Sequence, residues 1–152
     1  MALFTSYLSF LKTLEKWPNP VEFVYVARNR GNNEVAPSEG LLKQWKAGGI
    51  TWDGYRIAYL AELRNEESIA WMRRTAEKAK DHDVILICFE KDAEHCHRSL
   101  LAEEIARRFN VEFKGEVSTW LESALGRENT VKELSVSRGC SPPLSRGAET
   151  LL

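Results

Sequence analysis

The sequence has few cysteines and few histidines, three of each in 152 residues. An odd and sparse cysteine count excludes the disulfide framework of small secreted proteins and favours a reducing compartment, so we expect a cytoplasmic protein. Long apolar runs are also missing. No stretch reaches the roughly 18 residues of a membrane span, and the N-terminus lacks a secretory signal pattern. We therefore expect a globular domain without a membrane segment.

An excess of charge of one sign is missing as well. Lys and Arg number 21 and Asp and Glu 22, which gives a net charge of -1. This balance argues against bulk nucleic-acid binding but leaves room for a local basic patch. The chain also lacks a Cys-x-x-Cys redox pair, a Gly-Lys-Ser/Thr phosphate loop and a Gly-x-Gly-x-x-Gly turn. The three classes of protein that depend on those motifs are excluded.

The apolar patterning predicts an α/β domain with a small, mostly parallel sheet flanked by helices in three layers. Val84–Phe89 is a nearly unbroken apolar run, typical of a strand buried on both faces. The other expected elements, in chain order, are a helix over Met1–Lys16, a strand over Val21–Ala27, helices over Ser38–Trp45, Thr51–Leu63 and about Ser68–Lys80, a helix from within Ala93–Ser99 to Phe109, a strand over Val111–Val117 and a short helix over Trp120–Leu125.

The composition changes beyond about Glu133. Of the 15 residues from Ser135 to Glu149, 8 are Ser, Gly or Pro, and the apolar positions lose any period. We therefore predict a single domain over residues 1–126, followed by a loosely packed or disordered extension over residues 127–152.

The aromatic side chains of the predicted helices recur at helical spacing, which predicts that they build the core between helices and sheet. They are Trp45, Trp52, Tyr55, Tyr59 and Trp71.

One short segment concentrates the reactive side chains, between the end of a buried strand and the start of a helix. It contains Cys88, His95, Cys96 and His97. Parallel sheets bind ligands at the carboxyl ends of their strands, and a helix N-terminus favours anions and lowers the pKa of a cysteine placed there. The helix dipole supplies only about 0.3–1 kcal/mol, whereas a millimolar ligand needs about 4 kcal/mol. An anion site here therefore requires Arg98, with Arg28 as a second clamp.

Several motifs follow one another in a fixed order: Thr5-Ser6-Tyr7, a strand ending in Arg28, Ala36-Pro37-Ser38, the segment Ile50–Leu63, and Cys88-x-Glu90-Lys91 followed by Cys96-His97-Arg98. Together they resemble the family catalogued as domain of unknown function 488, over residues 3 to 118. The resemblance implies a compact α/β domain, bacterial or archaeal and cytoplasmic, without an established activity. Its motif positions are Tyr7, Arg28, Cys88, Glu90, Cys96, His97 and Arg98.

The chain departs from that family's pattern at two places. Relatives often have Lys-Pro after the arginine at position 28, where this chain has Asn29-Arg30-Gly31. Relatives commonly carry Pro-Gly and an aromatic residue before Cys-His-Arg, where this chain has Asp92-Ala93-Glu94-His95. His95 is therefore not a motif position.

Our leading hypothesis is an enzyme or ligand-binding domain that takes a small anion, such as a nucleotide or a phosphorylated metabolite. Cys96 is the expected thiol nucleophile, His97 its base or orienting group, and Glu90 a supporting carboxylate. The expected ligand-binding side chains are Arg28, Arg98, Cys88 and Tyr7.

Two alternatives stay open. In the first, the protein is a regulatory or interaction module whose Cys-His-Arg segment is structural, with Arg98 paired to Glu90 or Glu94. In the second, Cys88, Cys96 and His97 hold a metal ion, although their spacing matches no standard zinc motif. The sequence identifies neither a cofactor nor an oligomeric state.

Overall fold

The computed structural model describes residues 1–10, 14, 17–90, 92–119 and 121 of the chain. The chain divides after Glu116 into two units, and the fold below is that of the first, Met1–Glu116. The predicted domain end at residue 126 and the extension over residues 127–152 lie outside the described residues, as does most of the predicted helix Trp120–Leu125. In the described part of the chain, no helix is long and apolar enough to span a bilayer.

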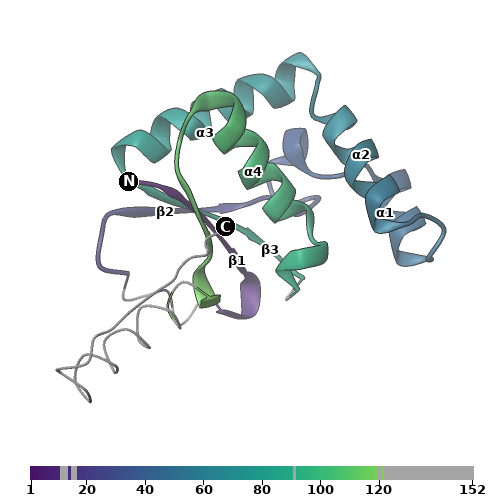
Figure 1. The fold of residues 1–152 in the computed structure, drawn as a ribbon, viewed down its shortest axis with the longest axis horizontal. Coiled ribbons are helices and arrows are strands. Elements are labelled where there is room, and N and C mark those ends of the chain that lie inside the picture. Colours follow the sequence, from purple (N-terminus) through teal and green to yellow (C-terminus); the bar gives the residue numbers. More distant parts are fainter. Residues whose placement is uncertain (11–13, 15–16, 91, 120, 122–152) are drawn as a thin grey trace, which may run out of the picture. The chain divides into compact units, whose positions relative to one another are not determined.

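The unit is built on a parallel sheet, as the sequence predicts (Figure 1). Its described strands are β1 (Leu3–Tyr7), β2 (Val21–Tyr25), β3 (Asp83–Cys88) and β4 (Phe113–Glu116), in the spatial order β2-β3-β1-β4. All neighbouring strands run parallel. The α/β class and the small parallel sheet are therefore confirmed.

Strand β3 is central, and every one of its residues is buried. It pairs with β1, from Leu3 opposite Val84 to Tyr7 opposite Cys88. It also pairs with β2, from Val21 opposite Asp83 to Tyr25 opposite Ile87. This register brings the carboxyl ends of three strands to one edge of the sheet. Cys88 is the last residue of β3 and lies at that edge.

The predicted helix over Met1–Lys16 is wrong at its start, because Leu3–Tyr7 forms strand β1. The apolar residues there do recur at helical spacing, but Leu3, Phe4, Thr5 and Ser6 are all buried. A central strand covered on both faces loses the alternation that marks a half-buried strand, so its pattern can be mistaken for a helix. Residues 11–13 and 15–16 of that prediction lie outside the described residues.

The remaining helices agree with the predicted ones within a few residues. They are α1 (Glu39–Lys46), α2 (Trp52–Glu62), α3 (Glu66–Asp81) and α4 (His97–Phe109), with short 3-10 turns at η2 (Asn33–Val35) and η3 (Ala93–His95). Three helices begin with a side chain that accepts a hydrogen bond from the backbone, which satisfies one free donor of the first turn. These N-cap residues are Ser38, Thr51 and Asn65.

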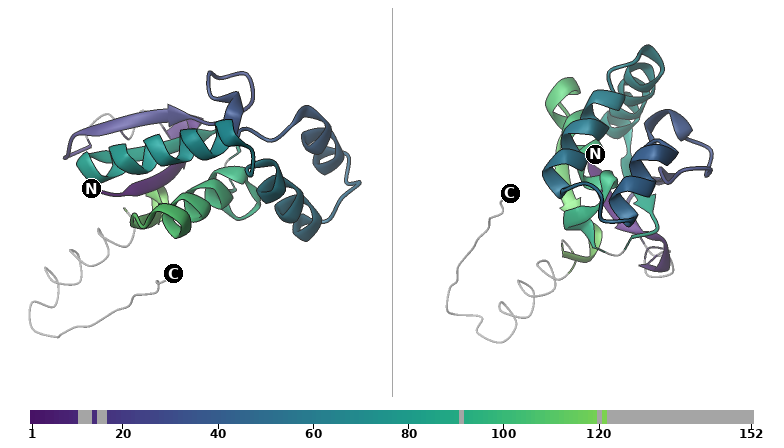
Figure 2. Two further views of the ribbon diagram at one scale, coloured as in Figure 1. Left: turned by 90° about the horizontal axis from the view of Figure 1, so that it is seen from above. Right: turned by 90° about the vertical axis from the view of Figure 1, so that its right-hand side faces the viewer.

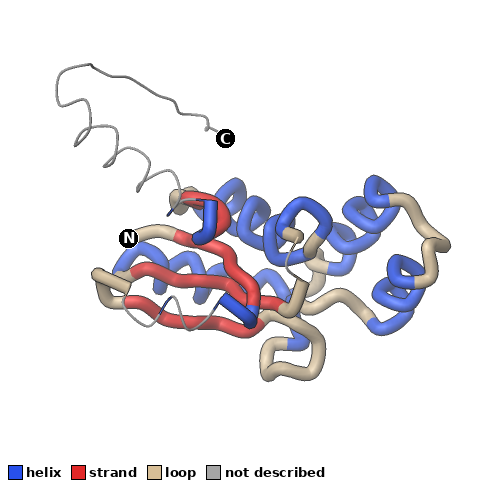
Figure 3. Tube along the Cα trace, turned by 90° about the horizontal axis from the view of Figure 1, so that it is seen from below, coloured by secondary structure: helices blue, strands red, loops and turns tan. Residues whose placement is uncertain are grey.

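Helices α3 and α4 cover the same face of the sheet (Figures 2 and 3). The connections β2-to-β3 and β3-to-β4 cross the sheet in one direction, so right-handed crossovers place both on one face. The connection β1-to-β2 crosses in the opposite direction, and Trp17 from this connection packs edge-on against Phe4 at 4.9 Å between ring centroids. Residues 11–13 and 15–16 of this connection lie outside the described residues.

Candidate functional site

Three segments meet at the carboxyl edge of the sheet: the residues after β2, the end of β3 and the first turn of α4. They enclose a cavity of about 160 Å³ together with α1 and α2. The lining residues are Ala27, Arg28, Leu42, Trp45, Lys46, Tyr55, Cys88, Phe89, Glu90, His95, Cys96 and His97. The structure therefore brings five of the seven predicted site residues to one cavity, and leaves Tyr7 and Arg98 out of its lining.

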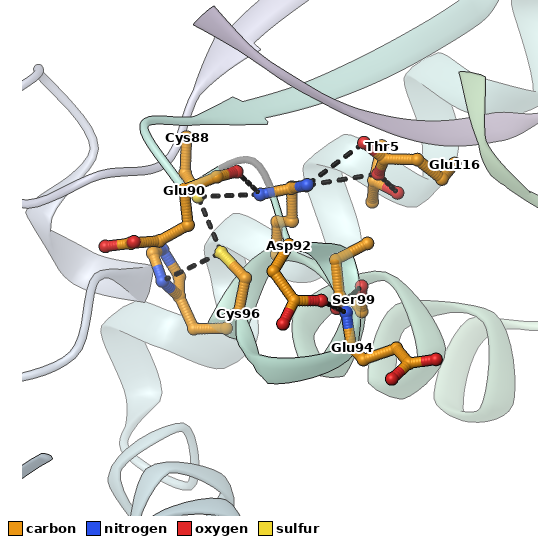
Figure 4. Close-up of polar contacts among 11 residues, drawn as sticks. Thr5, Cys88, Glu90, Asp92, Glu94, Cys96, Ser99 and Glu116 are labelled. Atoms are coloured by element: carbon orange, nitrogen blue, oxygen red, sulfur yellow. Dashed lines mark hydrogen bonds and ion pairs between the residues drawn. The ribbon is translucent and has the colours of Figure 1, made fainter. Parts of the chain in front are cut away.

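Two cysteines form the floor of the site. Cys88 ends β3 and Cys96 is the N-cap residue of α4, and their sulfur atoms lie 2.6 Å apart (Figure 4). Both side chains are buried, with exposed fractions of 3% and 2%, and both are free thiols. Their contact is a hydrogen bond in which one thiol donates to the other sulfur.

Arg98 lies behind the cysteines, with none of its side chain exposed. Its Nη1 donates to the Cys88 sulfur at 3.2 Å and to the backbone carbonyl of Glu90. Its Nε and Nη2 donate to the two carboxylate oxygens of Glu116, in β4, at 3.1 and 3.0 Å. Thr5 Oγ1 donates to the same carboxylate at 2.7 Å (Figure 4). The guanidinium is thus held by a two-point ion pair, a geometry that fixes its direction.

The predicted pairing of Arg98 with the side chain of Glu90 or Glu94 is wrong. The carboxylate that it contacts belongs to Glu116, and Glu90 contributes its backbone carbonyl. The Glu90 carboxylate points away from the guanidinium (Figure 4). The sequence alone did not indicate a role for Glu116. Because a helix was predicted over the residues of β1, the pairing of β1 with β4, which brings Glu116 beside Arg98, was not expected.

The charges around the two sulfurs make the cysteines unequal. The hydrogen bond from Cys96, together with the positive charge and hydrogen bond of Arg98, lowers the pKa of Cys88 to about 7 despite its burial. Burial, and then the neighbouring Cys88, raise the pKa of Cys96 well above its ordinary value. The opposite directions of the two shifts favour the thiolate at Cys88 and the protonated thiol at Cys96.

His97 is buried beside Cys96 and points its other edge at the backbone. Its Nε2 lies 2.8 Å from the carbonyl oxygen of Val26, which can only accept, so Nε2 carries the proton. Nδ1 then presents a lone pair to the Cys96 sulfur at 3.9 Å. Burial, and then the charge of Arg98, lower the pKa of His97 to about 4. His97 is therefore neutral at pH 7, and its Nδ1 can accept a hydrogen bond from the Cys96 thiol.

Arg28 and Tyr7 lie at opposite sides of this core. Arg28 lines the cavity, but its Nε donates to the carbonyl of Pro37 at 2.7 Å and its Nη2 to that of Ala36 at 3.5 Å. It therefore also anchors the loop before α1. Tyr7 contacts the site through Arg98, whose guanidinium carbon lies 5.9 Å from the centre of the Tyr7 ring.

The five aromatic residues predicted for the core do belong to it or pack against it, and two of them also form one wall of the cavity. Trp45 and Tyr55 line it, and both contact the ring of Trp52, at 5.4 and 5.2 Å between centroids. His95 packs edge-on against Trp52 at 5.1 Å and lines the cavity as well. Helical spacing could not separate these positions from core positions, because a helix that faces a pocket and one that faces the core show the same stripe.

The comparisons with known proteins agree with the resemblance seen in the sequence. No curated protein and no solved structure matches the chain. One family model does match, over residues 12–109, and it is described as the active DUF488-N3 subclade. The matched range contains every site residue discussed above except Tyr7, Thr5 and Glu116. Because this match covers more than half of the sequence, the chain belongs to the DUF488-N3a family.

Proposed function

We propose that this protein is a cysteine-dependent enzyme that acts on a small anionic ligand, with Cys88 as its nucleophile. The observation that carries the proposal is the hydrogen bond from the fully buried guanidinium of Arg98 to the Cys88 sulfur, at 3.2 Å. A thiolate is the reactive form of cysteine, and a fixed positive charge favours it at neutral pH. Cys88 is one of the residues that line the cavity, so a ligand bound there would lie close to it.

The lining of the cavity supports an anionic ligand of modest size. Arg28 and Lys46 supply two positive charges against the one carboxylate residue of the lining, Glu90, while Trp45 and Tyr55 supply apolar ring faces. The volume of about 160 Å³ is far above the ~10–15 Å³ that a single water needs.

The roles of the other motif residues follow from their contacts. Arg98 is a positioning residue, because its donors are directed to Glu116, Glu90 and the Cys88 sulfur and it does not line the cavity. Cys96 donates to the thiolate, and Nδ1 of neutral His97 lies 3.9 Å from the Cys96 sulfur, where it helps to orient this side chain. This proposal differs from the hypothesis based on the sequence in two respects. The nucleophile is Cys88 instead of Cys96, and Arg98 stabilises the Cys88 thiolate instead of binding the ligand.

Alkylation by iodoacetamide tests the thiolate, in a Cys140→Ser background that leaves two cysteines. We expect Cys88 to react with an inflection near pH 7, because its pKa is about 7, whereas an ordinary cysteine titrates near about 8.5. Peptide mass spectrometry identifies the modified residue, and the denatured protein supplies the reference rate. An inflection at or above the reference value, or faster modification of Cys96, would contradict the proposal.

The same alkylation assay also tests whether the cavity binds an anion. Inorganic phosphate is expected to slow the alkylation of Cys88, and Arg28→Gln and Lys46→Gln are expected to weaken that protection. Arg107→Gln is the matched control, because Arg107 is exposed on α4 and pairs with Glu104. If Cys88 reacts rapidly but phosphate does not slow the reaction, the thiolate part of the proposal stands and the anion-binding part is contradicted. The absence of both effects would favour the interaction module.

A metal site is the second candidate, because the ligand atoms of Cys88, Cys96 and His97 all lie within 4.8 Å of one another. Two sulfurs and one imidazole would leave an open position, as in catalytic zinc sites. The guanidinium of Arg98 opposes a dication at the Cys88 sulfur, since like charges repel strongly at a buried position. Elemental analysis of untagged protein is therefore expected to find far less than one equivalent of zinc. One full equivalent would overturn the thiolate proposal.

The proposal also assigns a compartment. A pair of thiols in hydrogen-bond contact stays reduced only in a reducing environment, which favours the cytoplasm.

A further inference from the structure

We propose that Cys88 and Cys96 form a peroxide-reactive thiol pair, in which a small hydroperoxide oxidises Cys88 and Cys96 resolves the product as an intramolecular disulfide. This inference rests on the proposed function, because it uses the same thiolate. It adds a reversible modification that would control that function.

The first argument is the distance between the sulfurs. They lie 2.6 Å apart, and a disulfide bond is about 2.05 Å long, so the two atoms need to approach by only about half an ångström. Cys88 ends β3 and Cys96 caps α4, so each is held by a regular element with a buried side chain. A thiol held this close to another can capture a short-lived oxidised form before a second oxidant arrives.

The second argument is that the pair is asymmetric. Arg98 donates to the sulfur of Cys88 through its charged guanidinium, whereas it donates to the sulfur of Cys96 through its backbone N–H. Cys88 is therefore the sulfur that attacks an oxidant, since the thiolate is the nucleophile. Cys96 keeps its proton and lies 3.9 Å from the Nδ1 lone pair of neutral His97. That nitrogen can orient the Cys96 thiol through a hydrogen bond, while the proton itself leaves with the departing hydroxide.

The third argument is access. Both cysteines line the cavity of about 160 Å³, yet only 3% and 2% of their side chains are exposed. A small oxidant such as hydrogen peroxide fits such a cavity, whereas a protein disulfide cannot bring its sulfurs to buried thiols. The oxidant class is therefore a hydroperoxide of low molecular weight.

The chemistry balances in two steps. The Cys88 thiolate attacks one oxygen of the hydroperoxide, the O–O bond breaks, and the sulfenic acid of Cys88 forms while the other oxygen leaves and takes up a proton as alcohol or water. The Cys96 sulfur then attacks the Cys88 sulfur, its proton passes to the departing hydroxide, and water leaves as the disulfide forms. The two sulfurs lose two electrons in total and the hydroperoxide gains them. A dithiol reverses the change by thiol–disulfide exchange.

The test treats the Cys140→Ser protein with hydrogen peroxide and maps it by mass spectrometry. We expect the loss of two hydrogen atoms, a cross-linked peptide joining Cys88 to Cys96, loss of both alkylatable thiols, and recovery of both with dithiothreitol. In the Cys96→Ser/Cys140→Ser protein we expect a sulfenic acid at Cys88 that dimedone traps. In the Cys88→Ser/Cys140→Ser protein we expect Cys96 to remain a free thiol.

The outcomes separate this inference from the proposed function. If Cys88 alkylates with an inflection near pH 7 but peroxide yields sulfinic acid at Cys88 while Cys96 stays alkylatable, the resolving role is overturned and the thiolate enzyme stands. If Cys88 shows neither rapid alkylation nor oxidation, both fail. Because the mapping on the protein with both cysteines needs no change at Cys88 or Cys96, misfolding of a variant cannot decide the result.

Discussion

Replacing Arg98 with methionine is expected to lower the free energy of unfolding by about 3–5 kcal/mol, the cost of breaking a buried ion pair by removing one partner. The side chain of Arg98 is fully buried and that of Glu116 is 10% exposed, so the carboxylate would be left without its partner and with little water. Urea unfolding measures the change. The same variant is expected to raise the pKa of Cys88, which the pH dependence of alkylation reports.

Two controls separate the buried pair from helix effects. Arg107→Met on the same helix removes an exposed pair with Glu104 and is expected to cost only about 0–1 kcal/mol. The Arg98→Met/Glu116→Met double variant is expected to lose less stability than the sum of the two single variants, because neither charge is left alone. A cost near that of Arg107→Met, or strict additivity in the double variant, would contradict the assignment of Arg98.

Acidification is expected to destabilise the protein through His97. The pKa of His97 is lowered to about 4, chiefly by burial, so the folded state keeps the ring neutral while the unfolded state takes up a proton below about pH 6.5. The unfolded state thus binds more protons, and stability falls as the pH falls from 6.5 to about 4. At about 1.4 kcal/mol per pH unit, the contribution amounts to roughly 3 kcal/mol.

The measurement compares the protein with His97→Gln by urea unfolding at several pH values between 7 and 4. Glutamine keeps an N–H donor for the carbonyl of Val26 but takes up no proton, so the variant is expected to lose less stability over this range. His95→Gln is the control, because the His95 side chain is 47% exposed and is expected to keep the acid sensitivity of the parent protein. Equal slopes for all three proteins would show that His97 is protonated in the folded state.

Much of the fold was predictable from local patterns in the chain. The apolar run around Val84–Phe89 contains the whole of β3 except its first residue, and Ser38 caps α1 as expected. These features depend on residues close in sequence. Strand β1 was not predictable in the same way, because it is buried between β3 and β4, and its partners are about 80 and 110 residues away.

The candidate site was also only partly predictable from residues close in sequence. The segment from Cys88 to Arg98 could be located from its residue types and from its place between a strand and a helix. The direction of the arginine could not, since it depends on the carboxylate of Glu116, which arrives from β4. Trp45 and Tyr55 were predicted as core residues only. Their place in the cavity lining could not be predicted, because it depends on how α1 and α2 pack at the edge of the sheet.

The sequence by itself determined the α/β class, the family resemblance and the short segment that carries two cysteines, a histidine and an arginine. Only the tertiary structure showed that the guanidinium of Arg98 contacts the sulfur of Cys88, which favours the thiolate there. A helix N-terminus favours Cys96, but its dipole is worth only about 0.3–1 kcal/mol. A buried guanidinium in contact with Cys88 outweighs it, because charges interact strongly where water is excluded.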